Sequence, residues 1–134
     1  MSALTKDRNT VRKQGEYAAY PVKGGNRIYA GSIVAMGADG YAVPGSDTAG
    51  LKFLGISREY VDNTTGADGG LTVTVWRRGC FELSASGMAK ANVGDAVYIA
   101  DDQTVGLTTT NNIPCGRISE FNSAASVYVD IEKA

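Results

Sequence analysis

The sequence predicts an all-β protein, a small β-barrel or sandwich whose strands are joined by short hairpins. Three observations lead to this prediction. Apolar residues alternate with polar ones in short runs, these runs are rich in β-branched and aromatic side chains, and Gly, Asn and Asp separate them. Gly makes up 17 of the 134 residues and Pro only 3, which favours tight turns over a flexible linker.

The alternation locates eleven strands along the chain. In the run 71–76, Leu71, Val73 and Val75 are expected on one buried face, because successive side chains of a strand point to opposite sides. The same pattern recurs at 127–132. The expected strands span residues 17–22, 27–30, 33–37, 40–43, 53–60, 71–77, 79–84, 96–100, 103–107, 115–121 and 126–132.

The segments between these strands have the composition of turns. Asp39 and Gly40 lie between two apolar runs and favour a hairpin. Residues 63–70 are polar or small and are expected to form a mobile surface loop. Residues 85–91 hold good helix formers interrupted by Gly87, so one short helical turn is expected there, crossing one end of the barrel.

Residues 1–15 differ from the rest, and we expect them to form an extended N-terminal arm. Near the start of the chain one acidic residue, Asp7, is outnumbered by four basic ones: Lys6, Arg8, Arg12 and Lys13. Apart from Met1, the sizeable apolar residues of this segment are Leu4 and Val11, so the segment contributes little to a core. A frayed terminus is the alternative. Residues 16–134 are then expected to form a single β-barrel domain.

The domain contains a possible internal repeat of residues 31–77 and 94–131. Glycines, a hairpin aspartate and β-branched runs recur in the same order in both stretches, at offsets of 61 to 63 residues as far as the loop at Asn63, which is shorter in the second stretch. Neither copy could bury its apolar face alone, whereas the two packed together could close a barrel. Convergence is the alternative, because short β units reuse Gly and Asp at turns.

The composition excludes several classes of function. Histidine is absent, which excludes histidine-based catalysis and histidine-liganded zinc. The net charge of −1 offers no global positive field to nucleic acid, and no apolar run is long enough to cross a membrane. The N-terminus lacks the apolar core of a signal peptide, so synthesis in a cytoplasm is expected.

Residues that carry chemistry are scarce. Asp101 and Asp102 form the only adjacent acidic pair and are expected to be solvated turn residues, without a metal ion. Cys80 and Cys115 are expected to be small buried thiols. Phosphate-binding glycine motifs are absent. We therefore expect no enzyme, no catalytic residues and no cofactor.

Four residues are candidates for contacts with another subunit or a partner. Trp76 lies opposite the aliphatic face of its run and next to Arg77, and Tyr98 and Tyr128 occupy similar positions in later strands. Large aromatic side chains on an outer face are typical of contact surfaces. Packing inside a sandwich is the alternative for these aromatic residues.

The joint order of turn and strand residues resembles that of a known family. The similarity covers nearly the whole chain, although no single motif is diagnostic. It rests on the segments TKDRNT (5–10), YAGSIVA (29–35), DGYAVP (39–44), Gly50-Leu51 with Gly55, YVDN (60–63) and VGDAVYIADD (93–102). In these positions the chain resembles the capsid cement, or decoration, proteins of tailed phages and prophages, among them the head-decoration protein of phage lambda.

The resemblance implies a structural protein that binds the outside of a phage head and stabilises the capsid lattice. Members similar to the lambda protein form trimers over local three-fold sites and extend N-terminal arms onto the shell. By this resemblance the partner is the major capsid protein, the location is the virion, and the chain forms a homotrimer. The expected capsid-binding arm contains Leu4, Thr5, Lys6, Arg8, Thr10, Val11, Arg12 and Lys13.

Two other functions remain open from the sequence. A head–tail completion or tail-tube protein would be a structural component that assembles as a ring. A small enzyme or ligand-binding β-domain would need a concave pocket with convergent polar groups.

Overall fold

The structure is a computed structural model that describes residues 2–134. These residues fold into twelve β-strands and two 3-10 turns, with no α-helix among them. The strands are β1 (Tyr17–Pro21), β2 (Asn26–Ile28), β3 (Ile33–Met36), β4 (Ala42–Pro44), β5 (Lys52–Ser57), β6 (Val61–Asn63), β7 (Thr72–Trp76), β8 (Cys80–Ser84), β9 (Ala96–Ile99), β10 (Val105–Gly106), β11 (Pro114–Ser123) and β12 (Ser126–Asp130). The 3-10 turns are η1 (Lys90–Asn92) and η2 (Ile131–Lys133).

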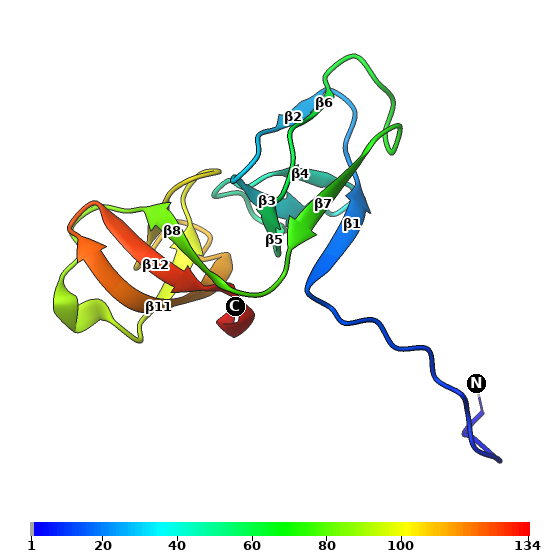
Figure 1. Cartoon of the computed structure of the whole chain (residues 1–134). Helices are drawn as coiled ribbons and strands as arrows, with labels where there is room; N and C mark the ends of the chain where they lie inside the picture. Colours follow the sequence, from blue (N-terminus) through cyan, green and yellow to red (C-terminus); the bar gives the residue numbers. More distant parts are fainter. Residues whose placement is uncertain (1) are drawn as a thin grey trace.

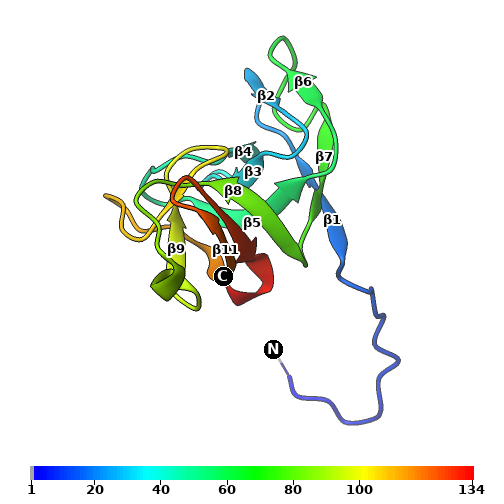
Figure 2. The ribbon, with the colours of Figure 1, turned by 60° about the vertical axis from the view of Figure 1, so that its left-hand side comes forward.

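The strands form three antiparallel sheets arranged in two lobes (Figure 1). The first lobe contains a five-stranded sheet of order β1-β7-β5-β3-β4 and the small sheet β2-β6. The second lobe contains a five-stranded sheet of order β10-β9-β11-β12-β8. The all-β prediction is therefore confirmed, and the chain crosses between the lobes once, from β7 to β8 (Figure 2).

The two five-stranded sheets have the same strand order. Apart from β2 and β6, which form their own sheet, the strands of the first sheet lie in the order first, fifth, fourth, second and third along the chain. The second sheet has this same order when it is read from its other edge, as β8-β12-β11-β9-β10. Backbone hydrogen bonds match as well: the N–H of Gly31 donates to Ser57 O at 2.9 Å, and the N–H of Gly94 donates to Ile118 O at 2.8 Å. We propose on this ground that the two lobes are copies of one ancestral unit.

A tightly packed glycine occupies the same place in each lobe. Gly55 has φ +157° and Gly116 has φ +149°, and each lies at an irregularity in the pairing of its strand. A Cβ atom on Gly55 would lie 2.0 Å from Trp76 O, and one on Gly116 would lie 2.4 Å from Asp130 O. Both lobes therefore need glycine here, because the carbonyl of the neighbouring strand occupies the place of a side chain.

The larger core is shared between the lobes. It contains the buried residues of the second sheet together with Ile33 and Ile56 of the first, and the half-buried Phe53 and Trp76 pack against it. Ile33 is fully buried, and its backbone N–H donates to Asp102 O in the second lobe at 2.7 Å. A smaller core of seven residues lies within the first lobe alone.

The structure corrects several details of the sequence-based expectations. Each of the eleven expected strands is present, and β6 is an additional strand that lies between the expected strand 53–60 and the expected loop and includes Asn63, the first residue of that loop. The helical turn expected near 85–91 lies at 90–92, because the N–H groups of Ala85 and Met88 donate to the turn at 124–125. Leu71 precedes β7 and is 46% exposed, so it does not continue the buried face.

Two further expectations concern the loop 63–70 and the two cysteines. The loop 63–70 is exposed for most of its length, yet the buried amide of Asn63 holds it by donating to Val22 O and Ala67 O. Cys115 is fully buried, and desolvation raises the pKa of its thiol to about 12. Cys80 is exposed, so the expectation of a buried thiol is correct for Cys115 and wrong for Cys80.

The carboxylate of Asp47 connects the loops of the two lobes. It accepts hydrogen bonds from the backbone N–H groups of Asn111 and Thr110, each at 2.9 Å. The Asn111 side-chain amide donates to Asp47 O, also at 2.9 Å. The backbone N–H of Asn111, followed by that of Thr110, holds the pKa of the Asp47 carboxyl below its ordinary value, although desolvation opposes them.

We expect Asp47→Ala to lower the melting temperature at neutral pH and to have little effect in strong acid. A carboxyl whose folded-state pKa is lowered stabilises the fold above its ordinary pKa, and this contribution is lost as the pH falls through the folded value. Melting temperatures of the natural protein and of Asp47→Ala, measured from neutral pH to about pH 2, check this. Asp101→Ala is the control, since Asp101 accepts only from Gln103 in its own turn. A gap between Asp47→Ala and the natural protein that stays constant in acid would contradict the assignment.

Candidate functional site

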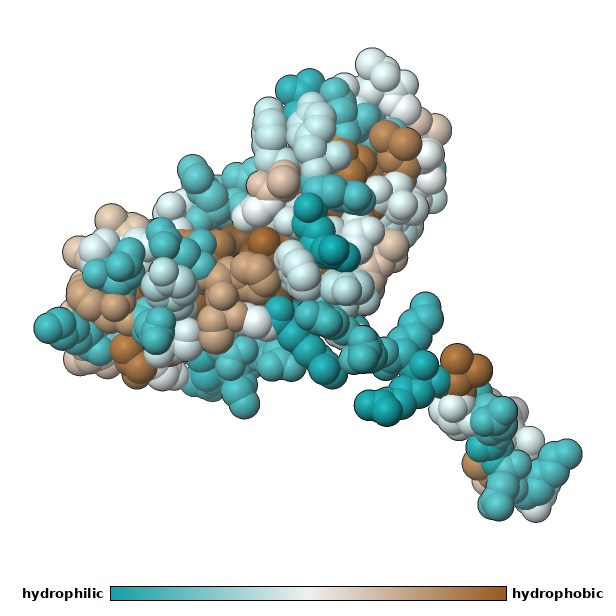
Figure 3. Space-filling view, in the orientation of Figure 1, coloured by the Kyte–Doolittle hydropathy of each residue, from teal (hydrophilic) through white to brown (hydrophobic). Residues whose placement is uncertain are grey.

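Residues 2–15, called the arm from here on, extend away from both lobes (Figures 1 and 2). The arm contains no strand, and its only backbone hydrogen bond among residues 2–14 joins the N–H of Thr10 to Arg8 O. Its two large apolar side chains are exposed, Leu4 at 72% and Val11 at 87%. In Figure 3 the surface of the arm is mostly hydrophilic, in keeping with its four basic side chains.

The arm joins the first lobe at the outer edge of its sheet. β1 pairs with β7 in antiparallel register, so that Tyr17 lies opposite Trp76. Their rings meet edge to face, with centroids 5.1 Å apart. The guanidinium of Arg58 lies 4.1 Å from the Tyr17 ring centre and 4.6 Å from that of Trp76. This cation–π stack fixes the point at which the arm leaves the body.

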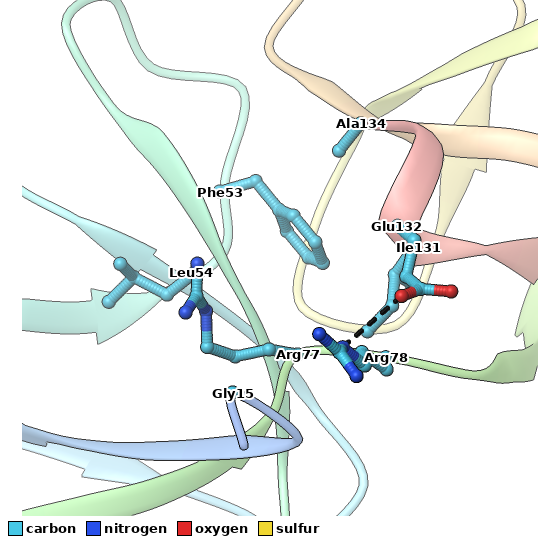
Figure 4. A pocket seen from close by; sticks show the side chains of 8 residues that line it. All are labelled: Gly15, Phe53, Leu54, Arg77, Arg78, Ile131, Glu132 and Ala134. Atoms are coloured by element: carbon cyan, nitrogen blue, oxygen red, sulfur yellow. Dashed lines mark ion pairs between the residues drawn. The ribbon is translucent and has the colours of Figure 1, made fainter. Parts of the chain in front are cut away.

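A cleft lies where the arm, the first lobe and the second lobe meet (Figure 4). We call it the junction cleft; its volume is about 390 Å³ and it is lined by Gly15, Phe53, Leu54, Arg77, Arg78, Ile131, Glu132 and Ala134. Phe53 points into the cleft, and Arg78 forms an ion pair with Glu132 at 3.3 Å. A neighbouring cleft of about 400 Å³ shares Arg78 and is lined also by Arg12, Gln14, Glu16 and Gly79.

The four predicted contact residues do not form one patch. Trp76 and Arg77 lie together at the junction, with Arg77 exposed and Trp76 half-buried against the shared core. Tyr98 and Tyr128 are half-buried on β9 and β12, with β11 between these strands. Arg58 has no local signal in the sequence, because only the pairing of distant strands brings it to Trp76.

A second aromatic pair lies elsewhere on the first lobe. Tyr29 and Tyr60 are both exposed, and their ring centres are 5.6 Å apart. Arg27 lies beside them, within 3.4 Å of the Tyr29 hydroxyl and 3.5 Å of an Asp62 carboxylate oxygen. These contacts raise the pKa of Arg27, first through its hydrogen bond to Tyr29.

Metal-binding clusters are not found in the part of the chain that the structure describes. No three His, Cys, Asp or Glu residues converge among residues 2–134. Asp101 instead accepts a hydrogen bond from the N–H of Gln103 at 2.9 Å, as expected for a turn residue. No helix within the described residues is long and apolar enough to cross a membrane.

Comparison with known families identifies the chain. The model of the phage cement protein family matches residues 11–132, which is most of the sequence. The chain belongs to the phage cement protein family. No curated protein and no solved structure matched it.

Membership of this family fixes the general function. A cement protein is a structural component of the virion that binds the capsid, and the family is not enzymatic. The resemblance found in the sequence is therefore confirmed at the level of the family. The match begins within the arm of this cement protein and leaves residues 2–10 outside it, so family membership alone assigns no role to that segment.

Proposed function

We propose that this cement protein coats the outer surface of a phage head as a homotrimer and holds the major capsid protein through its arm. Synthesis in the cytoplasm of the bacterial host is part of the proposal. The observation that carries the role of the arm is its exposure: residues 2–14 are all exposed and form no backbone hydrogen bond with the body. An exposed, extended segment of this length needs a partner to order it.

The arm can bind in two complementary ways. Its unpaired N–H and C=O groups can add along an exposed sheet edge of the capsid protein, which gives affinity through main-chain hydrogen bonds. Its four basic side chains can meet acidic groups at that site, while Leu4 and Val11 can enter apolar pockets. In a trimer three such arms act together, so avidity can raise affinity about 10²- to 10⁴-fold without a new type of contact.

Removal of residues 2–14 tests this proposal. We expect the truncated protein to lose binding to heads assembled without it, because the arm supplies the contact. The body should keep its melting temperature, since the strands begin at Tyr17. Binding is measured by co-sedimentation with heads, and stoichiometry by native mass spectrometry.

Two further measurements complete the test. A full-length variant with Lys6, Arg8, Arg12 and Lys13 all changed to Gln separates the contribution of charge from that of the backbone, and we expect weaker binding with a smaller dependence on salt. Normal coating by the truncated protein would refute the role of the arm. A single ring of copies at the head–tail joint, in place of many copies over the shell, would refute the role in coating.

A further inference from the structure

A short sequence motif occurs twice and its copies meet in space. Residues 10–15 read TVRKQG and residues 74–79 read TVWRRG, so both have Thr-Val, a basic residue two positions later, and Gly two positions after that. The first copy lies in the arm and the second at the end of β7. Both precede the first strand of a lobe, which agrees with a duplicated unit.

Strand pairing brings the end of the first copy next to the end of the second. Because β1 and β7 are antiparallel with Tyr17 opposite Trp76, the segment before β1 and the segment after β7 emerge at the same end of the sheet. The N–H of Arg77 donates to Glu16 O at 2.8 Å. A Cβ atom on Gly15 would lie 3.6 Å from Nη2 of Arg78, and Arg12 and Arg78 line the same cleft.

The meeting of the two copies concentrates positive charge that the protein only partly neutralises. Arg78 pairs with Glu132, and Arg58 is held over two aromatic rings. Within residues 2–134 the guanidinium groups of Arg12 and Arg77 have no hydrogen-bond or ion-pair partner. Glu16 and Glu132 are the acidic residues lining the two clefts, against three arginines.

The junction cleft also has an apolar part: Phe53 points into it, while Ile131 and Leu54 line it and pack in the larger and the smaller core respectively. A ligand that fits it therefore combines carboxylate groups with an apolar side chain. The adjoining second lobe, residues 79–134, carries seven acidic and three basic residues. A long polyanion such as nucleic acid would be repelled there, whereas a short acidic peptide ends before it reaches this surface.

We infer that the junction cleft is a second docking element of this cement protein, which binds an acidic segment of the major capsid protein that carries an apolar anchor residue. The inference rests on the proposed function and extends it, because it assigns the body, as well as the arm, a direct part in capsid recognition. The partner segment runs beside the arm and ends in the cleft, with its carboxylates facing Arg77 and Arg12. The cleft then provides the specificity of binding, and the arm extends the contact over the capsid surface.

Reversal of one charge in the full-length protein tests the inference. We expect Arg77→Glu to weaken binding to heads assembled without the protein at least tenfold, since it places a carboxylate against the acidic segment. Arg77 is exposed and its side chain is unpaired, so the fold should be kept, and circular dichroism checks this. Lys90→Glu is the matched control, because Lys90 is exposed on η1 in the second lobe, and its binding should stay within twofold of the natural protein.

A second measurement uses a defined probe. Trp76 is the only tryptophan in the chain and packs at the junction, so its fluorescence reports on the cleft. Titration with a ten-residue peptide of glutamates with one central leucine should change this fluorescence, and Arg77→Glu should abolish the change. A ten-nucleotide single-stranded oligothymidylate of similar charge should bind more weakly, and equal or tighter binding of the oligonucleotide would overturn the inference.

The outcomes separate this inference from the proposed function. If the protein without residues 2–14 fails to bind heads and Arg77→Glu binds normally, the arm proposal stands and the cleft inference is wrong. If Arg77→Glu weakens binding and the truncated protein coats normally, the cleft inference stands and the arm proposal is wrong. Arg77→Glu combined with Arg78→Glu repeats the test with a larger charge change, and normal binding by both variants rejects the cleft.

Discussion

Gly55→Ala and Gly116→Ala should each lower the free energy of unfolding by about 3 to 5 kcal/mol. Each glycine has a φ angle that other residues rarely adopt, and each new Cβ would overlap a backbone carbonyl of the neighbouring strand, 2.0 Å away at Gly55 and 2.4 Å at Gly116. A carbonyl within a sheet cannot rotate away as a flexible side chain can. The strands must therefore separate, and the hydrogen bonds around the irregularity weaken. Chemical denaturation followed by circular dichroism measures the loss.

Gly40→Ala provides the control for this prediction. Gly40 has φ +86°, but a Cβ atom there would have no neighbour within 4 Å. Its replacement should cost only about 1 to 2 kcal/mol, the strain of the left-handed backbone alone. A loss at Gly55 or Gly116 no larger than at Gly40 would show that the close approach of the strands is easily relieved.

Ile33→Ala should lower the stability of both lobes by about 4 kcal/mol. The side chain of Ile33 comes from the first sheet but lies in the core that the second sheet supplies, and it is fully buried. Its removal leaves a cavity at the contact between the lobes. Amide hydrogen exchange at Val75 in β7 and Val129 in β12 reports on the two sheets separately, and protection should fall at both positions.

Ile33→Val is the matched variant, because it removes one methylene and should cost about 1 kcal/mol. A loss that scales with the volume removed identifies the cavity as the cause. If Ile33→Ala reduces protection in β7 and leaves β12 unchanged, the lobes unfold independently, and residues 16–134 are not a single domain. Equal losses at both sites support the single domain expected from the sequence.

The strands could be predicted because their signal is local. Val73 and Val75, or Val127 and Val129, alternate with polar or half-buried neighbours, and this pattern fixes both the strand and its buried face. β6 gives no such signal: Asp and Asn are unfavourable in strands, and its Asn63 is buried because its amide bonds to Val22, 41 residues away. The helical turn lies later in the chain than predicted for a related reason: the backbone N–H groups of Ala85 and Met88 donate hydrogen bonds to a distant hairpin.

The functional surface could be predicted only in part for the same physical reason. The charge and polarity of the arm can be read directly from its sequence. Trp76 and Arg77 were identified by their position next to a strand, and the structure places them at the junction. The junction cleft itself depends on the fold bringing together Gly15, Phe53 and Ile131, which line it and lie far apart in the chain. No periodicity within one segment contains that information.

The independence of the arm from the body has a consequence for how such a protein can diverge. Residues 2–14 are exposed and form no backbone hydrogen bond with the lobes, so mutations there should change the folding energy of the lobes little. Selection on residues 2–14 then acts on recognition, and a lineage can adapt to a changed capsid surface through substitutions in this short segment. Grafting the arm of one relative onto the body of another is, by the same reasoning, a direct way to retarget the protein.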